Sequence, residues 1–323
     1  MNARFVFCLI ITLAIFSVTV ANAQEPELPD PGITPDSWIY GFKRAFETIT
    51  LFFTFDEVAK VEKRLQYAEL RLSEAKTMAE KGKLEYIDNL LEDYGKELKE
   101  VNKIASLAKD ASTKEKLSEL VAKATSHHLE ILDKVQEIVP EQAKDKISAA
   151  KERSIKGNQE ALRVLATENP EKAAELAMNV AEGRINKAKQ AAEKGNAEEA
   201  AEAAEEYEKY ARFGEEIAAI AQQTGKDPSE VHEIVAKATS IHLTILEDVL
   251  QKVPKQAKAA IQSAIEESKV GIESAIEALE ERGRSISELP PVSEKEGIKV
   301  ETPDMPEVPE QPKTPETGQK GGQ

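Results

Sequence analysis

Hydrophobic positions recur every three or four residues through most of the chain, which is the spacing of one buried stripe on an α-helix. Apolar side chains follow this period between residues 58 and 79 and again between 84 and 105. Gly82 separates the two stripes and suits the left-handed position that ends a helix. Aromatic residues make up only 5 % of the chain, a low share for a β-sandwich or barrel. The pattern therefore predicts an all-α protein.

The stripes belong to a unit that occurs twice. Residues 121–126 (VAKATS) recur letter for letter at 235–240, and matching positions continue on both sides at offsets of 113 or 114. Agreement over this length predicts two tandem copies of one helical unit. We place these copies at residues 54–168 and 169–284.

The number of helices in each copy depends on Pro140 and Pro254. A proline inside a helix costs about 3 kcal/mol, so each one marks either a kink or a tight turn. We favour the turn, because an unbroken helix over residues 114–165 would be unusually long for a globular protein. Each copy then has about four helices, arranged as an antiparallel bundle or a pair of helical hairpins. A capping box at Thr54–Glu57 predicts the start of the first copy.

The second copy is unusually rich in alanine. Sixteen alanines lie between Ala173 and Ala221, where the first copy uses Leu, Ile and Val at many positions. Small side chains let helices approach closely, but they bury less apolar area per residue. We therefore expect the first helical pair of the second copy to depend on its neighbours for stability.

The two ends of the chain have compositions of their own. A basic start, an almost unbroken apolar run from Phe5 to Val20 and an A-x-A site ending at Ala23 are typical of a secretory signal peptide, residues 1–23. An uncleaved anchor is the alternative, although the apolar run is shorter than the roughly 20 residues that span a bilayer. Proline recurs every third residue from 303 to 315, so residues 285–323 are predicted to be an acidic, disordered tail.

A turn-rich segment with an amphipathic, aromatic helix, residues 24–53, precedes the first copy and has no counterpart before the second. Aromatic side chains then recur at helical spacing. They give our candidate interaction residues: Trp38, Phe42, Phe46, Phe52, Phe53 and Phe55. The interpretation that we favour is a lid that covers the bundle. The alternative is an exposed face that docks on a membrane or a partner, because Trp and Phe on an amphipathic helix suit an interface.

Charge and motifs restrict the chemistry. The formal net charge of −16 disfavours a nucleic-acid partner. No nucleophile motif, phosphate loop or cofactor motif is present, so we expect neither an enzyme nor a cofactor. His128 and His242 occupy matching positions in the two copies and are weak candidates for a metal or pH-sensing site. Neither has a ligand at metal-binding spacing, so we favour core histidines that are bonded across the bundle.

The segment LPDPGITPDS at residues 28–37, the aromatic run to Asp56, and the KATS-x-HL segment at 123–129 with Val139-Pro140 resemble an uncharacterised family of exported helical proteins of archaea and bacteria. This resemblance implies a secreted or envelope-bound domain of unknown function and brings no catalytic residues. We therefore expect a non-enzymatic extracytoplasmic scaffold or protein-binding module of the cell envelope, which meets a partner or itself through helix faces. A membrane-surface module that docks through residues 38–55 is the alternative.

Overall fold

A computed structural model of the chain describes residues 28–284. These residues form nine α-helices and two short 3₁₀-helices and contain no strand, which confirms the all-α prediction. The elements are α1 (Tyr40–Phe52), α2 (Glu57–Glu80), η1 (Leu84–Tyr86), α3 (Ile87–Leu107), α4 (Ala111–Ile138), α5 (Glu141–Glu168), α6 (Pro170–Glu193), α7 (Ala197–Gln223), α8 (Ser229–Lys252), η2 (Lys255–Ala257) and α9 (Lys258–Glu280).

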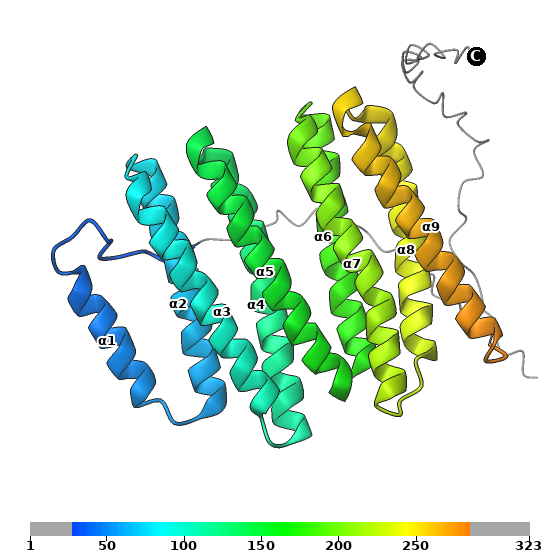
Figure 1. Cartoon of the computed structure of the whole chain (residues 1–323), viewed down its shortest axis with the longest axis horizontal. Helices are drawn as coiled ribbons and strands as arrows, with labels where there is room; N and C mark the ends of the chain where they lie inside the picture. Colours follow the sequence, from blue (N-terminus) through cyan, green and yellow to red (C-terminus); the bar gives the residue numbers. More distant parts are fainter. Residues whose placement is uncertain (1–27, 285–323) are drawn as a thin grey trace, which may run out of the picture. The chain divides into compact units, whose positions relative to one another are not determined.

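Consecutive helices pair as antiparallel hairpins, α2 with α3, α4 with α5, α6 with α7 and α8 with α9 (Figure 1). Each copy therefore has four helices, arranged as two hairpins. The hairpins pack in two layers, because α2, α4, α6 and α8 contact one another in order, and so do α3, α5, α7 and α9. α5 also packs against α6 and α7, so one hydrophobic core continues from the first copy into the second.

The helix ends follow the local sequence. Pro140 lies between α4 and α5, and Pro254 lies between α8 and η2, so both prolines mark turns rather than kinks. Gly82 adopts the left-handed conformation that was predicted for it, with a φ of 70°. The predicted capping box at Thr54 is wrong in detail: the first copy starts at Asp56, whose side chain accepts a hydrogen bond from the Ala59 amide at 2.8 Å.

The alanine-rich helices α6 and α7 pack closely against their neighbours. Most of their alanines are buried in the core. α7 approaches α8 so closely at Gly214 that an added Cβ would lie 2.7 Å from Cγ2 of Val235. Glycine is therefore required at this contact between α7 and α8.

The predicted signal peptide at 1–23 and the predicted tail at 285–323 lie outside the described residues. Among residues 28–284, none of the helices has the length and apolar character that a bilayer span requires.

Candidate functional site: the aromatic face of α1 and the charged cluster beneath it

The aromatic side chains of the α1 segment point into solvent. All six candidate interaction residues are between 65 % and 88 % exposed, and Ile49 is 53 % exposed. We call Trp38, Phe42, Phe46, Ile49, Phe52, Phe53 and Phe55 the aromatic face. The expectation that these residues form a lid over the bundle is therefore wrong, because a lid would bury them.

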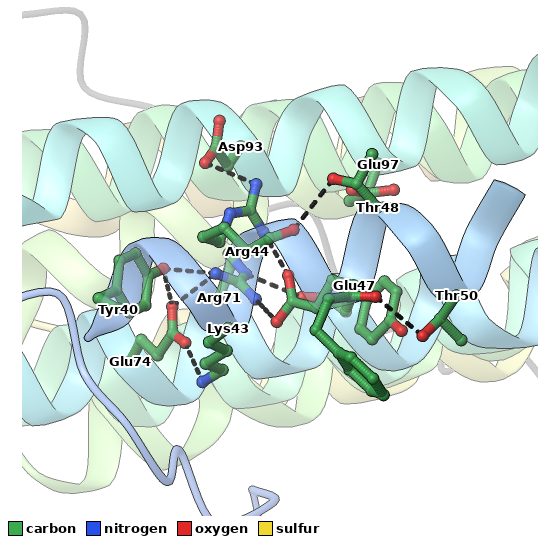
Figure 2. A network of polar contacts seen from close by, with 12 residues as sticks. Tyr40, Lys43, Arg44, Glu47, Thr48, Thr50, Arg71, Glu74, Asp93 and Glu97 are labelled. Atoms are coloured by element: carbon green, nitrogen blue, oxygen red, sulfur yellow. Dashed lines mark hydrogen bonds and ion pairs between the residues drawn. The ribbon is translucent and has the colours of Figure 1, made fainter.

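The opposite side of α1 is polar and packs against α2. Glu47, in the middle of α1, is only 6 % exposed and is paired with Arg71 of α2 at 2.5 Å. Arg71 is fully buried and also pairs with Glu74 at 2.9 Å. Figure 2 shows these side chains converging between the two helices. α1 is thus attached through charged groups, while its apolar side faces outward.

The remaining members of this charged cluster satisfy the two buried carboxylates. Tyr40 donates a hydrogen bond to Glu74 at 2.7 Å, and Lys43 pairs with the other oxygen of Glu74 at 2.5 Å. Arg44 pairs with Glu47 at 2.7 Å and reaches Asp93 of α3 at 3.0 Å. Burial and the hydrogen bond to Glu74 raise the pKa of Tyr40 above its usual value, so the phenol stays neutral and remains a donor.

Three cations and three carboxylates balance in the cluster: Lys43, Arg44, Arg71, Glu47, Glu74 and Asp93. Buried charges need such pairing, because an unpaired one would cost several kcal/mol. Lys43 and Arg44 are the cations of α1, and both are engaged on its inner side. The aromatic face therefore carries no cation of its own helix.

A second cluster of the same kind lies between the two copies. Arg184 of α6 pairs with Asp133 of α4 at 2.7 Å and with Glu206 of α7 at 3.2 Å. Lys151 of α5 pairs with Asp133 and with Glu206, both at 2.9 Å. Although burial favours a neutral lysine, Glu206 and Asp133 raise the pKa of Lys151 above its usual value. Lys151 is therefore charged at any physiological pH.

The two clusters correspond through the internal repeat. At the offset of 113, Arg71 matches Arg184 and Asp93 matches Glu206. Each set also has partners from the element that precedes its copy: Asp133 of α4 and Lys151 of α5 for the second copy, and Glu47 and Arg44 of α1 for the first. α1 therefore takes the place against the first copy that α4 and α5 take against the second.

The repeated histidines lie apart from this site, on α4 and α8. His128 is fully buried, with Nδ1 3.3 Å from the Tyr94 hydroxyl and Nε2 3.6 Å from a Glu69 oxygen. His242 packs its ring against Tyr207, with centroids 5.6 Å apart, and its Nδ1 has no hydrogen-bond partner within residues 28–284. The expectation of a hydrogen-bonded core histidine therefore fits His128 only.

Metal binding finds no support at these histidines. Nowhere in the described part of the chain are three or more His, Cys, Asp or Glu side chains placed to hold a metal ion. Burial lowers the pKa of His242 from 6.5 to about 4 and also lowers that of His128. Both rings are therefore neutral near pH 7.

The charged cluster was missed at the sequence level. Glu47, Arg71 and Glu74 have side-chain types that normally lie on the surface, so a hydrophobic pattern gives them no role. One signal was available: Arg71 and Arg184 are matching arginines within otherwise apolar helical stripes. A charge repeated on a buried face indicates a pairing that both copies need.

Fold and site together define an all-α repeat protein with an N-terminal capping helix, built from two copies of a four-helix unit. A family profile, "Domain of unknown function (DUF5667)", matches residues 32–142 and 154–256. The chain therefore belongs to the DUF5667 family. The first matched segment includes α1, and the second begins within α5, so the family unit also starts with a helix that precedes each copy.

No protein with a curated function matches the sequence. Among the solved structures that are similar to this chain is "DHF58 filament", with 21 % identity, a TM-score of 0.43, and coverage of 70 % of this chain and 99 % of that one. Another is "DHF119 filament", with 25 % identity, a TM-score of 0.42 and the same coverage. Similarity at these TM-scores defines neither the fold nor an assembly of this chain.

Proposed function

We propose that this protein is a non-enzymatic, extracytoplasmic helical module of the cell envelope that docks on a membrane surface through the aromatic face of α1. The orientation of α1 supports this proposal, because the charged side of the helix is buried against α2 while its aromatic side is exposed. Helices α2–α9 then form a scaffold that is held at the membrane and offers its own surfaces to other proteins.

The size of the aromatic face supports a docking role. Six aromatic side chains of roughly 150–250 Å² each, about three-quarters exposed, present on the order of 900 Å² of surface. The largest apolar patch of an ordinary monomer is about 300–600 Å². The terminal helices of repeat proteins usually turn a polar face to solvent. An exposed aromatic face at the end of a repeat protein therefore indicates a surface that a membrane or another protein covers.

The composition of the face favours lipid as that occupant. Tryptophan and phenylalanine suit the boundary between headgroups and acyl chains. Docking would depend on apolar burial rather than on charge, because Lys43 and Arg44 are already paired on the inner side of α1. The apolar segment Phe5–Val20, which predicts export, also brings the chain to a membrane during synthesis.

Liposome flotation tests this proposal. The mature chain from Gln24 is expected to float with zwitterionic phosphatidylcholine vesicles, and binding should change little between 50 and 500 mM NaCl. Phe42→Ser/Phe46→Ser should lose most of the bound fraction, because each phenylalanine contributes about 2 kcal/mol on burial. The matched control replaces two exposed apolar residues elsewhere, Ile241→Ser/Val270→Ser, and should float normally.

Two outcomes would overturn membrane docking. One is a wild-type chain that stays in solution with vesicles of every composition. The other is a chain that forms a dimer in analytical ultracentrifugation, does not float, and becomes monomeric with Phe42→Ser/Phe46→Ser. This second result would assign the aromatic face to self-association.

A further inference from the structure

A groove runs between α3 and α5 in the first copy, on helices other than α1. It has a volume of about 750 Å³ and spans Glu92 to Ser106 along α3. At 1.5 Å per residue this length is about 21 Å. An extended peptide advances about 3.3 Å per residue, so the groove has room for a segment of about six residues.

The walls of the groove are basic, although the whole chain is acidic. Six cations line it, against two acidic residues, Glu92 and Glu160. The cations are Lys96, Lys99, Lys103, Arg153, Lys156 and Arg163. Such a concentration is unexpected in a chain with a net charge of −16. A cleft of one sign concentrates ligands of the opposite sign.

Most of these cations lack an internal partner. Lys96 pairs with Glu92 and Asp93, and Arg163 pairs with Glu216. The other four, Lys99, Lys103, Arg153 and Lys156, have no ion pair among residues 28–284. By contrast, the buried cations of the two clusters are fully paired. The groove therefore offers positive charge that the described part of the fold does not neutralise.

The second copy provides an internal comparison, because only two of the six cationic positions of the groove keep a cation there, while three become glutamate and one becomes valine. Lys103 corresponds to Glu216 at the offset of 113, and Arg153 corresponds to Glu267 at the offset of 114. Arg163 corresponds to Glu277 and Lys156 to Val270, whereas Lys96 and Lys99 correspond to the cations Lys209 and Arg212. Both copies pack their helices in the same way, so packing alone does not explain why the groove of the first copy is basic.

The backbone and one buried side chain shape the floor. Gly95 leaves space for Arg153 to lie across α3, since an added Cβ would meet Cδ of Arg153 at 3.0 Å. Asn102 donates from Nδ2 to the Gly157 carbonyl at 3.0 Å, and its buried Oδ1 has no hydrogen-bond partner among the described residues. Because this oxygen is buried, a ligand in the groove meets the charged walls rather than Asn102.

We infer that the groove between α3 and α5 is a binding site for an extended acidic peptide segment of a partner protein. Carboxylates of the segment pair with Lys99, Lys103, Arg153 and Lys156. The site is separate from the aromatic face of α1, so it does not depend on membrane docking. A chain that is bound at a membrane would hold such a partner there.

Fluorescence anisotropy with labelled hexaglutamate tests the inference on the mature chain. We expect binding at 50 mM NaCl that weakens at least tenfold at 300 mM, and no binding of hexaglutamine. Lys99→Glu/Lys103→Glu/Arg153→Glu should weaken binding at least tenfold. A control with the same change in net charge, Lys116→Glu/Lys255→Glu/Lys258→Glu, uses three lysines that have no ion pair among residues 28–284 and should change affinity less than threefold.

A second measurement locates the peptide without any variant. Carbodiimide joins a carboxylate to a lysine that it contacts, so hexaglutamate should be linked mainly to Lys99, Lys103 and Lys156. Phe42→Ser/Phe46→Ser should bind hexaglutamate as wild type does, which separates this site from the proposed membrane docking. Absence of binding, equal losses in the two triple variants, or crosslinks scattered over other helices would overturn the inference. Tighter binding of a six-nucleotide oligothymidylate in the same groove would assign the groove to nucleic acid instead.

Discussion

The buried pair of Arg71 and Glu47 should decide whether α1 stays attached to the rest of the fold. In Arg71→Met the guanidinium is lost, so Glu47 and Glu74 lose a partner in a site where Arg71 and Glu74 are fully buried. Removing one member of a buried ion pair costs about 3–5 kcal/mol. That cost is of the same order as the whole stability of many domains.

The cost should appear locally. When α1 leaves α2, both carboxylates return to water, so release of α1 relieves the strain without unfolding the core. A change of 3 kcal/mol corresponds to a factor of about 100 in an equilibrium constant. We therefore expect amide hydrogen exchange in residues 40–52 to accelerate about 100-fold in Arg71→Met, while exchange in α8 and α9 stays unchanged.

Two controls make the test specific. Arg212→Met removes a cation that is 60 % exposed and should cost no more than about 1 kcal/mol, because exposed ion pairs contribute little. Replacing the pair together, as Arg71→Met/Glu47→Leu, leaves Lys43 paired with Glu74 and Arg44 paired with Asp93. This variant should restore most of the protection of α1, since apolar replacements of buried ion pairs are often neutral. If amide hydrogens of α1 exchange in Arg71→Met at the same rate as in the wild type, the assigned role of the charged cluster is refuted.

Three further predictions concern the rest of the fold. Burial lowers the pKa of His242 from 6.5 to about 4, so the contribution of the neutral ring to stability is complete above pH 6.5 and is lost as the pH falls from 6.5 towards 4, by up to about 3 kcal/mol. The difference in unfolding free energy between pH 7 and pH 5, measured in urea, should therefore be smaller in His242→Leu than in the wild type. An equal difference would contradict the assignment. In thermal melts, Gly214→Ala should lower stability by about 1–3 kcal/mol, because the added Cβ clashes with Val235. The control Gly183→Ala meets nothing within 4 Å and should be neutral or stabilising. Equal effects of the two substitutions would count against the close approach of α7 to α8. The isolated fragment 169–282 should melt at a lower temperature and less cooperatively than the mature chain, because its alanine-rich helix contacts bury little area and the contacts of α5 with α6 and α7 are lost. Thermal melts followed by circular dichroism test this. A fragment that melts at the same temperature and as cooperatively as the mature chain would refute it.

Much of the fold could be predicted from the sequence because its signals are local. The three-four period predicted the helices, and Pro140 and Pro254 predicted the turns within each copy. These prolines, read as turns, predicted four helices per copy. The helix caps could not be assigned in the same way, because several polar residues near each helix start compete for the position: Asp56 caps α2 where Thr54 was expected.

The orientation of α1 could not be read from the same signals. A hydrophobic pattern gives the period of a helix, and it assumes that the apolar side is the buried one. In α1 the pairing of Glu47 with Arg71 reverses that assumption. The basic groove was equally hidden, because its cations come from two helices about 60 residues apart, and the sequence does not say that α3 packs against α5.

The repeat itself explains why α1 faces the way it does. Arg71 and Asp93 are the first copy's versions of Arg184 and Glu206, which need a cation and a carboxylate from the element that precedes them. In the first copy α1 supplies these groups through Arg44 and Glu47. Once one side of a single helix is committed to buried charges, its aromatic side has nowhere to pack within the described fold. The exposed aromatic face is thus a consequence of how the repeat begins, and the membrane proposal gives that face its occupant.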